Sequence, residues 1–96
     1  MVQGESRRSR QIMVALRARG CFCFKVHGSA LMMAGLPDII GCYQGLFFAF
    51  ETKLDPHTTP SPRQRWVMRL IRQAGGWAAQ VTTPADALGE IDAMVA

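Results

Sequence analysis

Three charged residues, Asp38, Glu51 and Lys53, have the side-chain types and the spacing that metal-assisted hydrolysis requires. Gln44-Gly45, which lies between the two acids, is typical of a two-residue hairpin turn. If it forms that turn, Asp38 lies opposite Glu51 on the neighbouring strand, and directly opposed residues share a face. Lys53, two positions beyond Glu51, points to the same face. The spacing therefore predicts two carboxylates and one ammonium group together at one end of a sheet.

Such a cluster is costly in a strand unless something compensates for the repulsion between the carboxylates. A Mg²⁺ ion would do so, because it takes oxygen ligands from one or two carboxylates, from water and from phosphate. We expect Asp38 and Glu51 to bind the metal and the backbone carbonyl of Thr52 to supply a further oxygen. Lys53 is then expected to orient a water molecule or to offset charge on a phosphate. The alternative is a plain salt bridge between Lys53 and a carboxylate at the strand end.

The elements that must position these residues follow from the hydrophobic periodicity and the turn residues. The pattern predicts the order α-β-β-β-α-β-α, and hence an α/β fold in which a mixed sheet is flanked by helices. The length of 96 residues fits one domain, residues 1–96. Helices are expected at about 5–19, from 62 to the glycines at 75–76, and from 84 to the end, and strands at 21–27, 38–43, 46–53 and 77–82.

The second helix has a strong start signal. Ser61 is expected as its N-cap, Pro62 as its first residue and Gln64 as the partner of Ser61 in a capping box. The apolar residues of this helix that we expect to face the core are Trp66, Val67, Leu70, Ile71 and Ala74. We also expect Trp77 in the core.

Cysteine usage argues against a disulfide or a zinc site. The chain has 3 cysteines, an odd number, and they form no zinc-finger spacing with the 2 histidines. We therefore expect Cys21, Cys23 and Cys42 to be small buried hydrophobic side chains.

The distribution of charge indicates a nucleic-acid partner. All 11 Lys and Arg residues lie before position 73, and outside the cluster they are nearly all arginine, which is suited to bidentate phosphate contact. A solvated basic surface is the alternative. The candidate DNA contacts are Arg7, Arg8, Arg10, Lys25, Arg63, Arg65, Arg69 and Arg72. For His27, at the end of the first strand, a solvated position is the simpler interpretation. No apolar stretch is long enough to span a membrane or to serve as a signal peptide, so we expect a cytoplasmic protein.

A family resemblance follows from these motifs. Two segments, with 12 residues between their acids, together resemble the PD-(D/E)XK nuclease signature. They are Leu36-Pro37-Asp38-Ile39-Ile40-Gly41 and Phe50-Glu51-Thr52-Lys53. More narrowly, the chain resembles the small stand-alone form of the VRR-NUC (virus-type replication-repair nuclease) domain. Glu5 matches that family's early acid, Ser61-Pro62-Arg63-Gln64 matches its Ser/Thr-Pro-x-Gln segment, and Gly75-Gly76 also fits. The resemblance spans about Glu5 to Thr83, and Thr52 stands where an apolar residue is usual.

The resemblance implies a restriction-endonuclease-like αβββαβ(α) core and a Mg²⁺- or Mn²⁺-dependent endonuclease that acts as a homodimer on branched DNA such as Holliday junctions. Asp38 and Glu51 would bind metal, Lys53 would be catalytic, Gln64 would line the site and Glu5 would assist. Gln64 has the alternative of acting only in the capping box, and Glu5 that of a favourable acid in the first turn of a helix. The rival functions are a restriction-type or archaeal-resolvase-like nuclease, and a non-catalytic DNA-binding or assembly module of the same fold.

Overall fold

The computed structural model describes the chain from Val2 to Ala96 except Ser29, and describes side chains from Gly4 onward. Its elements follow the predicted order, with α1 beginning three residues earlier than expected. The helices are α1 (Val2–Arg19), α2 (Pro62–Gln73) and α3 (Pro84–Val95). The strands are β1 (Phe22–Lys25), β2 (Ile39–Tyr43), β3 (Leu46–Thr52) and β4 (Trp77–Val81). Position 29 of the expected loop 28–36 lies outside the described residues.

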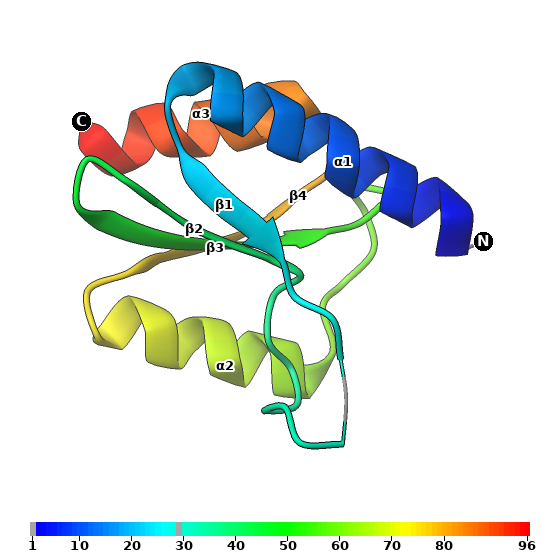
Figure 1. Cartoon of the computed structure of the whole chain (residues 1–96). Coiled ribbons are helices and arrows are strands. Elements are labelled where there is room, and N and C mark those ends of the chain that lie inside the picture. Colours follow the sequence, from blue (N-terminus) through cyan, green and yellow to red (C-terminus); the bar gives the residue numbers. More distant parts are fainter. Residues whose placement is uncertain (1, 29) are drawn as a thin grey trace.

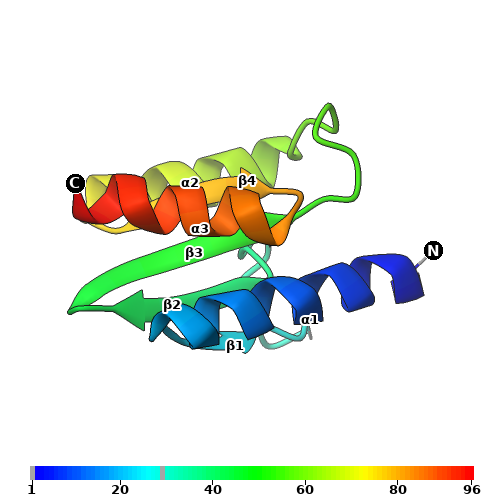
Figure 2. The same cartoon turned by 90° about the horizontal axis from the view of Figure 1, so that it is seen from above.

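The four strands form one mixed sheet in the order β1-β2-β3-β4. The pairs β1–β2 and β2–β3 are antiparallel, whereas β3 and β4 are parallel because α2 connects them. Helices α1 and α3 cover one face of the sheet, and α2 lies on the other face (Figures 1 and 2). The predicted α/β fold with a mixed sheet between helices is therefore confirmed.

The core lies between the sheet and the pair α1 and α3. Ile12 and Leu16 of α1 and Phe48 and Phe50 of β3 are all fully buried there. Gly41 of β2 allows this close packing, since a Cβ atom at that position would lie 2.5 Å from the Phe48 ring and 2.3 Å from a main-chain oxygen of β1.

The β2–β3 hairpin has the register that the sequence predicts. Tyr43 pairs with Leu46, and the pairing continues without a bulge to Ile39 and Phe50. The turn residues both have positive φ, 52° at Gln44 and 80° at Gly45, as a type I′ turn requires. The tight turn therefore fixes which residues of β2 and β3 meet at the far end of the hairpin.

Two expectations about the core are wrong. Trp66 is 41% exposed, Leu70 is 37% exposed and Ala74 is exposed as well, because α2 packs on β4 and buries Val67 and Met68, leaving its flank uncovered. Cys42 is exposed, since no helix covers its face of β2. Cys21 and Cys23 are buried as expected, and burial raises the pKa of the Cys21 thiol to about 11, so that it stays protonated near neutral pH. Trp77 packs partly buried against the core.

None of the helices within the described residues is long and apolar enough to cross a membrane.

Candidate active site

Asp38 lies immediately before β2 and is held at three atoms. Its Oδ1 accepts a hydrogen bond from the Thr52 main-chain nitrogen at 2.7 Å, and its Oδ2 accepts one from the Ser9 hydroxyl at 2.9 Å. Its main-chain oxygen accepts a bond from Val26 at 2.7 Å. The Lys25 Nζ lies 3.2 Å from Oδ2. The carboxylate is therefore fixed from α1, from β3 and from the end of β1.

The position of Asp38 differs in one respect from the sequence prediction. Strand β2 begins at Ile39, so the ladder ends at the pair Ile39–Phe50, one step short of the expected pair Asp38–Glu51. The Asp38 carboxylate, and not its main chain, accepts the hydrogen bond from the Thr52 N–H. A side-chain contact thus continues the pairing beyond the end of the ladder. The two acids are neighbours, but through this arrangement and not as facing residues of a continued ladder.

Glu51 is almost completely buried, with 5% of the residue exposed. Burial raises its pKa to about 7, and the negative charges of Asp38 and, more weakly, Glu5 act in the same direction. The Lys53 Nζ lies 3.4 Å from Glu51 Oε2 and lowers the pKa in part. A buried carboxyl group that is repelled by a second carboxylate is an unfavourable arrangement for a fold and a common one in functional sites.

The two candidates for assisting roles, Glu5 and Gln64, have different surroundings. Glu5 of α1 lies near enough for its charge to raise the pKa of Glu51, so it belongs to the same neighbourhood. Gln64 forms the predicted capping box: its Oε1 accepts from the Ser61 nitrogen at 2.9 Å and its own nitrogen donates to the Ser61 hydroxyl at 3.1 Å. The structural role of Gln64 is confirmed, and its catalytic role stays a prediction.

Ser9 is a functional candidate that the sequence reasoning missed. It is fully buried, donates to Asp38 and accepts a hydrogen bond from Lys25 Nζ at 3.0 Å. Its position gave a signal, because Ser9 stands three and seven residues before the buried Ile12 and Leu16 and is thus a polar residue on the apolar stripe of α1. Lys25 contacts Asp38 and Ser9 in the structure, and its predicted contact with DNA stays a prediction.

The donor set fits a small hard cation. Asp38 and Glu51 offer carboxylate oxygens, and the Thr52 carbonyl stands between Glu51 and Lys53, which is the kind of ligand set that Mg²⁺ or Mn²⁺ takes together with water. The part of the chain that the structure describes holds no group of three or more His, Cys, Asp or Glu that could bind a metal. The fit therefore rests on two carboxylates and a carbonyl. The raised pKa of Glu51, which burial and then the charge of Asp38 cause, is a second observation in its favour.

Some of the arginines predicted to contact DNA already have partners within the protein, and others do not. Arg8 donates to the Thr82 carbonyl, Arg65 to the Pro60 carbonyl at 3.3 Å, and Arg72 binds the Ala78 carbonyl through two nitrogens at 3.2 and 2.9 Å. Arg63 stacks on the Trp66 ring, 4.8 Å from its centroid, and approaches the Ala34 carbonyl. Within the described residues, Arg7, Arg10 and Arg69 have no such partner and are exposed.

Comparison with solved structures identifies proteins of the same fold. No family model matches the sequence, and no curated protein is significantly similar to it. A solved structure of a VRR_NUC domain is similar over 92% of this chain and 94% of that chain, with a TM-score of 0.76 and 22% sequence identity. The chain has the VRR-NUC fold. Hjc of Archaeoglobus fulgidus, a Holliday junction resolvase from an archaeal hyperthermophile, is similar over 78% of this chain and 64% of the resolvase chain, with a TM-score of 0.62 and 20% identity.

The VRR-NUC fold confirms the architecture that the motifs implied, a restriction-endonuclease-like core with the mixed sheet between helices. At identities near 20% the likeness concerns the fold. The chemistry must therefore be argued from this chain's own residues.

Proposed function

We propose that the chain is a metal-dependent DNA endonuclease that hydrolyses phosphodiester bonds. One observation carries the proposal: burial, and next to it the negative charge of the neighbouring Asp38, raise the pKa of Glu51, while Lys53 contacts the same carboxylate. For stability alone a buried acid next to a second acid is unfavourable. A bound divalent cation would remove the repulsion, and the VRR-NUC fold is supporting evidence for a nuclease.

In this proposal each side chain has a defined task. Asp38 and Glu51 bind Mg²⁺ or Mn²⁺ together with the Thr52 carbonyl. When bound, such an ion polarises the phosphodiester and makes a water molecule a better nucleophile. Ser9 and the Thr52 N–H fix the orientation of Asp38, as supporting hydrogen bonds do around metal ligands. Lys53 donates hydrogen bonds to the attacking water or to a phosphate oxygen, where it offsets negative charge as it develops. Glu5 and Gln64 are assigned assisting roles.

Branched DNA is the proposed substrate and a homodimer the proposed active form. The likeness to the Holliday junction resolvase supports the substrate. Two symmetric cuts in a four-way junction need two active sites at a fixed separation, which a twofold dimer of a small domain provides.

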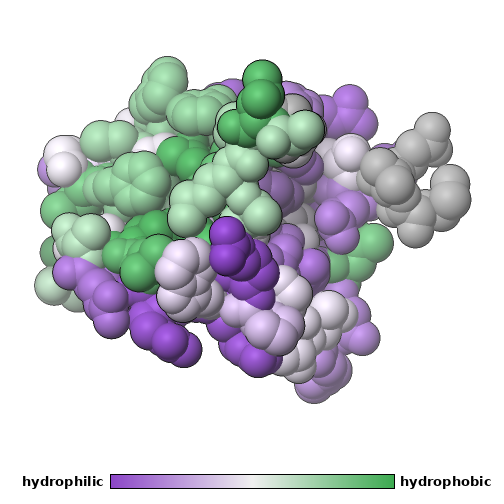
Figure 3. All heavy atoms as spheres, turned by 90° about the horizontal axis from the view of Figure 1, so that it is seen from below, coloured by the Kyte–Doolittle hydropathy of each residue, from purple (hydrophilic) through white to green (hydrophobic). Residues whose placement is uncertain are grey.

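An uncovered apolar face of the sheet supports the dimer. By register, one face of the sheet carries five side chains without charge: Phe22 and Phe24 of β1, Ile40 and Cys42 of β2, and Phe47 of β3. Phe22 is 69% exposed and Phe47 is 43% exposed, because α2 covers only the β3–β4 half of this face. Figure 3 shows the apolar area on the side of the molecule that carries α2. We assign this face to a second copy of the chain, since an exposed patch of large apolar side chains is a feature of interfaces.

A non-catalytic DNA-binding or assembly module of the same fold is the contrasting function. Such a module would have no use for Lys53 on the buried carboxylate Glu51. An archaeal-resolvase-like nuclease is the rival within the enzymes, and it would use the same three charged residues; the likeness to Hjc favours it over a restriction-type nuclease.

The test is a comparison of DNA products. Wild type and Lys53→Ala are incubated with linear, flapped and four-way DNA, with and without Mg²⁺, and the products are separated on a gel. We expect wild type to cut the four-way DNA only with metal, and Lys53→Ala to bind it without cutting. Binding without any cut in Mg²⁺ or Mn²⁺ would favour the non-catalytic module, and equal cutting of linear DNA would remove the branched-DNA assignment.

A further inference from the structure

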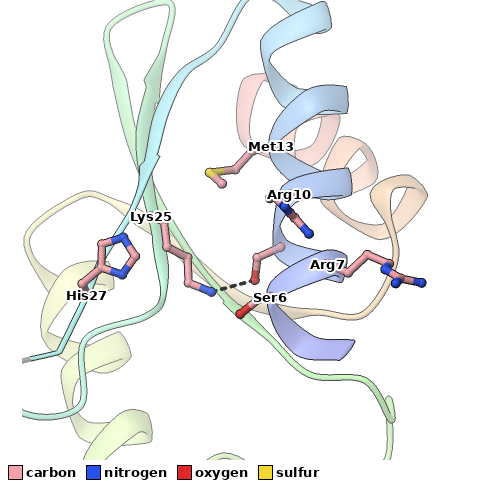
Figure 4. A pocket seen from close by; sticks show the side chains of 7 residues that line it. Ser6, Arg7, Arg10, Met13, Lys25 and His27 are labelled. Atoms are coloured by element: carbon pink, nitrogen blue, oxygen red, sulfur yellow. Dashed lines mark hydrogen bonds between the residues drawn. The ribbon is translucent and has the colours of Figure 1, made fainter. Parts of the chain in front are cut away.

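A groove lies between α1 and the end of β1, beside the candidate metal site. It consists of two adjoining pockets of about 620 and 570 Å³, which share Ser6, Lys25 and His27. One end is lined by Glu5 and Leu54, and the other by Arg7, Arg10 and Met13. Figure 4 shows Lys25 and His27 entering from the β1 side, opposite Arg10 and Met13 of α1. The groove thus leads from Glu5 to a basic end.

The basic end carries positive charge that the fold does not use. Arg17 donates to the Cys23 carbonyl at 2.9 Å, and Arg19 forms an ion pair with Asp92. Arg7 and Arg10 are on the same helix, and in the described part of the chain neither contacts an acid or a carbonyl. No acid lines the larger pocket. A concave site lined by unneutralised arginines favours an anion with several acceptor oxygens.

Lys25 ties this groove to the candidate metal site. Its ammonium group lies 3.2 Å from Asp38 Oδ2 and donates to Ser9, while its side chain forms part of the wall of both pockets. Lys25 would therefore lie between an anion in the basic end and a phosphate held at Asp38. In a nucleic-acid strand, every nucleotide carries one phosphate, so two neighbouring anion sites match two phosphates of one strand.

We propose that the groove is a subsite for an internal phosphodiester of the DNA strand that is cut, next to the scissile phosphate. Arg10 is its principal contact, Arg7 contributes at the rim, and His27 supplies a hydrogen bond. The proposal rests on the proposed function, because the scissile phosphate is placed at Asp38 and Glu51. Its effect is to set the direction in which the strand crosses the active site, since only one end of the groove is basic.

The first experiment measures binding of metal-free protein to four-way DNA by fluorescence anisotropy at several salt concentrations. We expect Arg10→Gln to weaken binding about five- to tenfold at 0.1 M salt and to lower the slope of log Kd against log salt by about one. Arg19→Gln is the matched control, because it removes the same charge from the same helix outside the groove. Equal slopes for Arg10→Gln and wild type would overturn the subsite.

The second experiment identifies the phosphate. Single linkages of the DNA are replaced by neutral methylphosphonate, and binding is measured without metal for wild type and for Arg10→Gln. At one linkage, the replacement is expected to weaken binding to wild type and to cause no further loss of binding to Arg10→Gln. The same loss in both proteins at every linkage, or a dependence on a terminal 5′-phosphate instead, would contradict the proposal. Neither experiment requires cleavage. A protein that binds in this way without cutting would therefore keep the phosphate contact at Arg10, and would refute the proposed function together with the assignment of the neighbouring phosphate as scissile.

Discussion

The ammonium nitrogen of Lys53 lies 3.4 Å from Oε2 of Glu51, two positions earlier in the chain. Burial and the negative charge of Asp38 disfavour the anionic form of the Glu51 carboxyl group, whereas the positive charge of Lys53 favours it. The pKa of Glu51 is about 7 as a result. Near neutral pH the metal-free protein therefore holds Glu51 partly in its protonated form.

Metal affinity should depend on pH through Glu51. A carboxyl group must lose its proton to bind a cation, so affinity should fall about tenfold for each pH unit below about 7 and level off above it. Calorimetric titration with Mn²⁺ between pH 5.5 and 8.5 measures this. Lys53→Met should move the break in the curve to higher pH, because Lys53 lowers the pKa of Glu51. An affinity that is constant over this range would contradict the assignment of Glu51 as a ligand.

The same pKa predicts that Glu51→Gln stabilises the metal-free protein at high pH. The folded-state pKa of Glu51 is above its unfolded value of 4.5, so its contribution to stability is fully present below pH 4.5 and is lost as pH rises through about 7. Above pH 8 the loss is up to about 3 kcal/mol, a value that already includes the favourable charge of Lys53. Urea unfolding at pH 5 and pH 8.5 should show a wild-type loss that the variant lacks. A variant less stable than wild type at pH 8.5 would refute the prediction.

Ser9→Ala should weaken metal binding without touching a ligand. The substitution removes the hydroxyl that donates to Asp38 Oδ2 at 2.9 Å, so the carboxylate loses one of the contacts that orient it. We expect at least a tenfold loss of Mn²⁺ affinity and about 1 kcal/mol of stability. Calorimetry and urea unfolding check the two values. Gln11→Ala, an exposed change on the same helix, is the control and should match wild type.

The fold and the centre of the site were largely predictable because local signals determine them. Gln44-Gly45 fixes the hairpin register, and the Ser61–Gln64 capping box fixes the start of α2. The pairing of Ile39 with Phe50 then brings Asp38 and Glu51 close without any knowledge of the rest of the chain.

The contacts from α1 were not predictable in the same way. The approach of Ser9 to Asp38 depends on how α1 crosses the sheet, which is a property of packing and not of the spacing along the chain. The prediction for Trp66 was wrong for a similar reason: its spacing in α2 is that of a core residue, but α2 packs through Val67 and Met68 and leaves Trp66 41% exposed. Periodicity identifies an apolar side of a helix, whereas the tertiary arrangement decides how much of that side is covered.

Phe22→Glu should separate the proposed dimer. Phe22 is 69% exposed in the single chain, so the substitution leaves the core intact but places two like charges in a symmetric interface. Sedimentation equilibrium should show a dimer for wild type and a monomer for the variant, with similar urea midpoints for the separated chains. Val14→Glu is the matched control, because Val14 is 66% exposed on α1, away from the apolar face. If wild type is a monomer, or if Phe22→Glu remains a dimer, the apolar face is not the interface.

The central claim is that Asp38 and Glu51 together make a cation site that cuts DNA. The most direct measurement is the single-turnover cleavage rate of four-way DNA as a function of Mg²⁺ concentration for wild type, Asp38→Asn and the surface control Asp92→Asn. The account predicts no cutting in EDTA, a saturable rate for wild type and Asp92→Asn, and at least a hundredfold lower rate for Asp38→Asn with DNA binding retained. Cutting that persists in EDTA, or an Asp38→Asn rate equal to that of wild type, would contradict it.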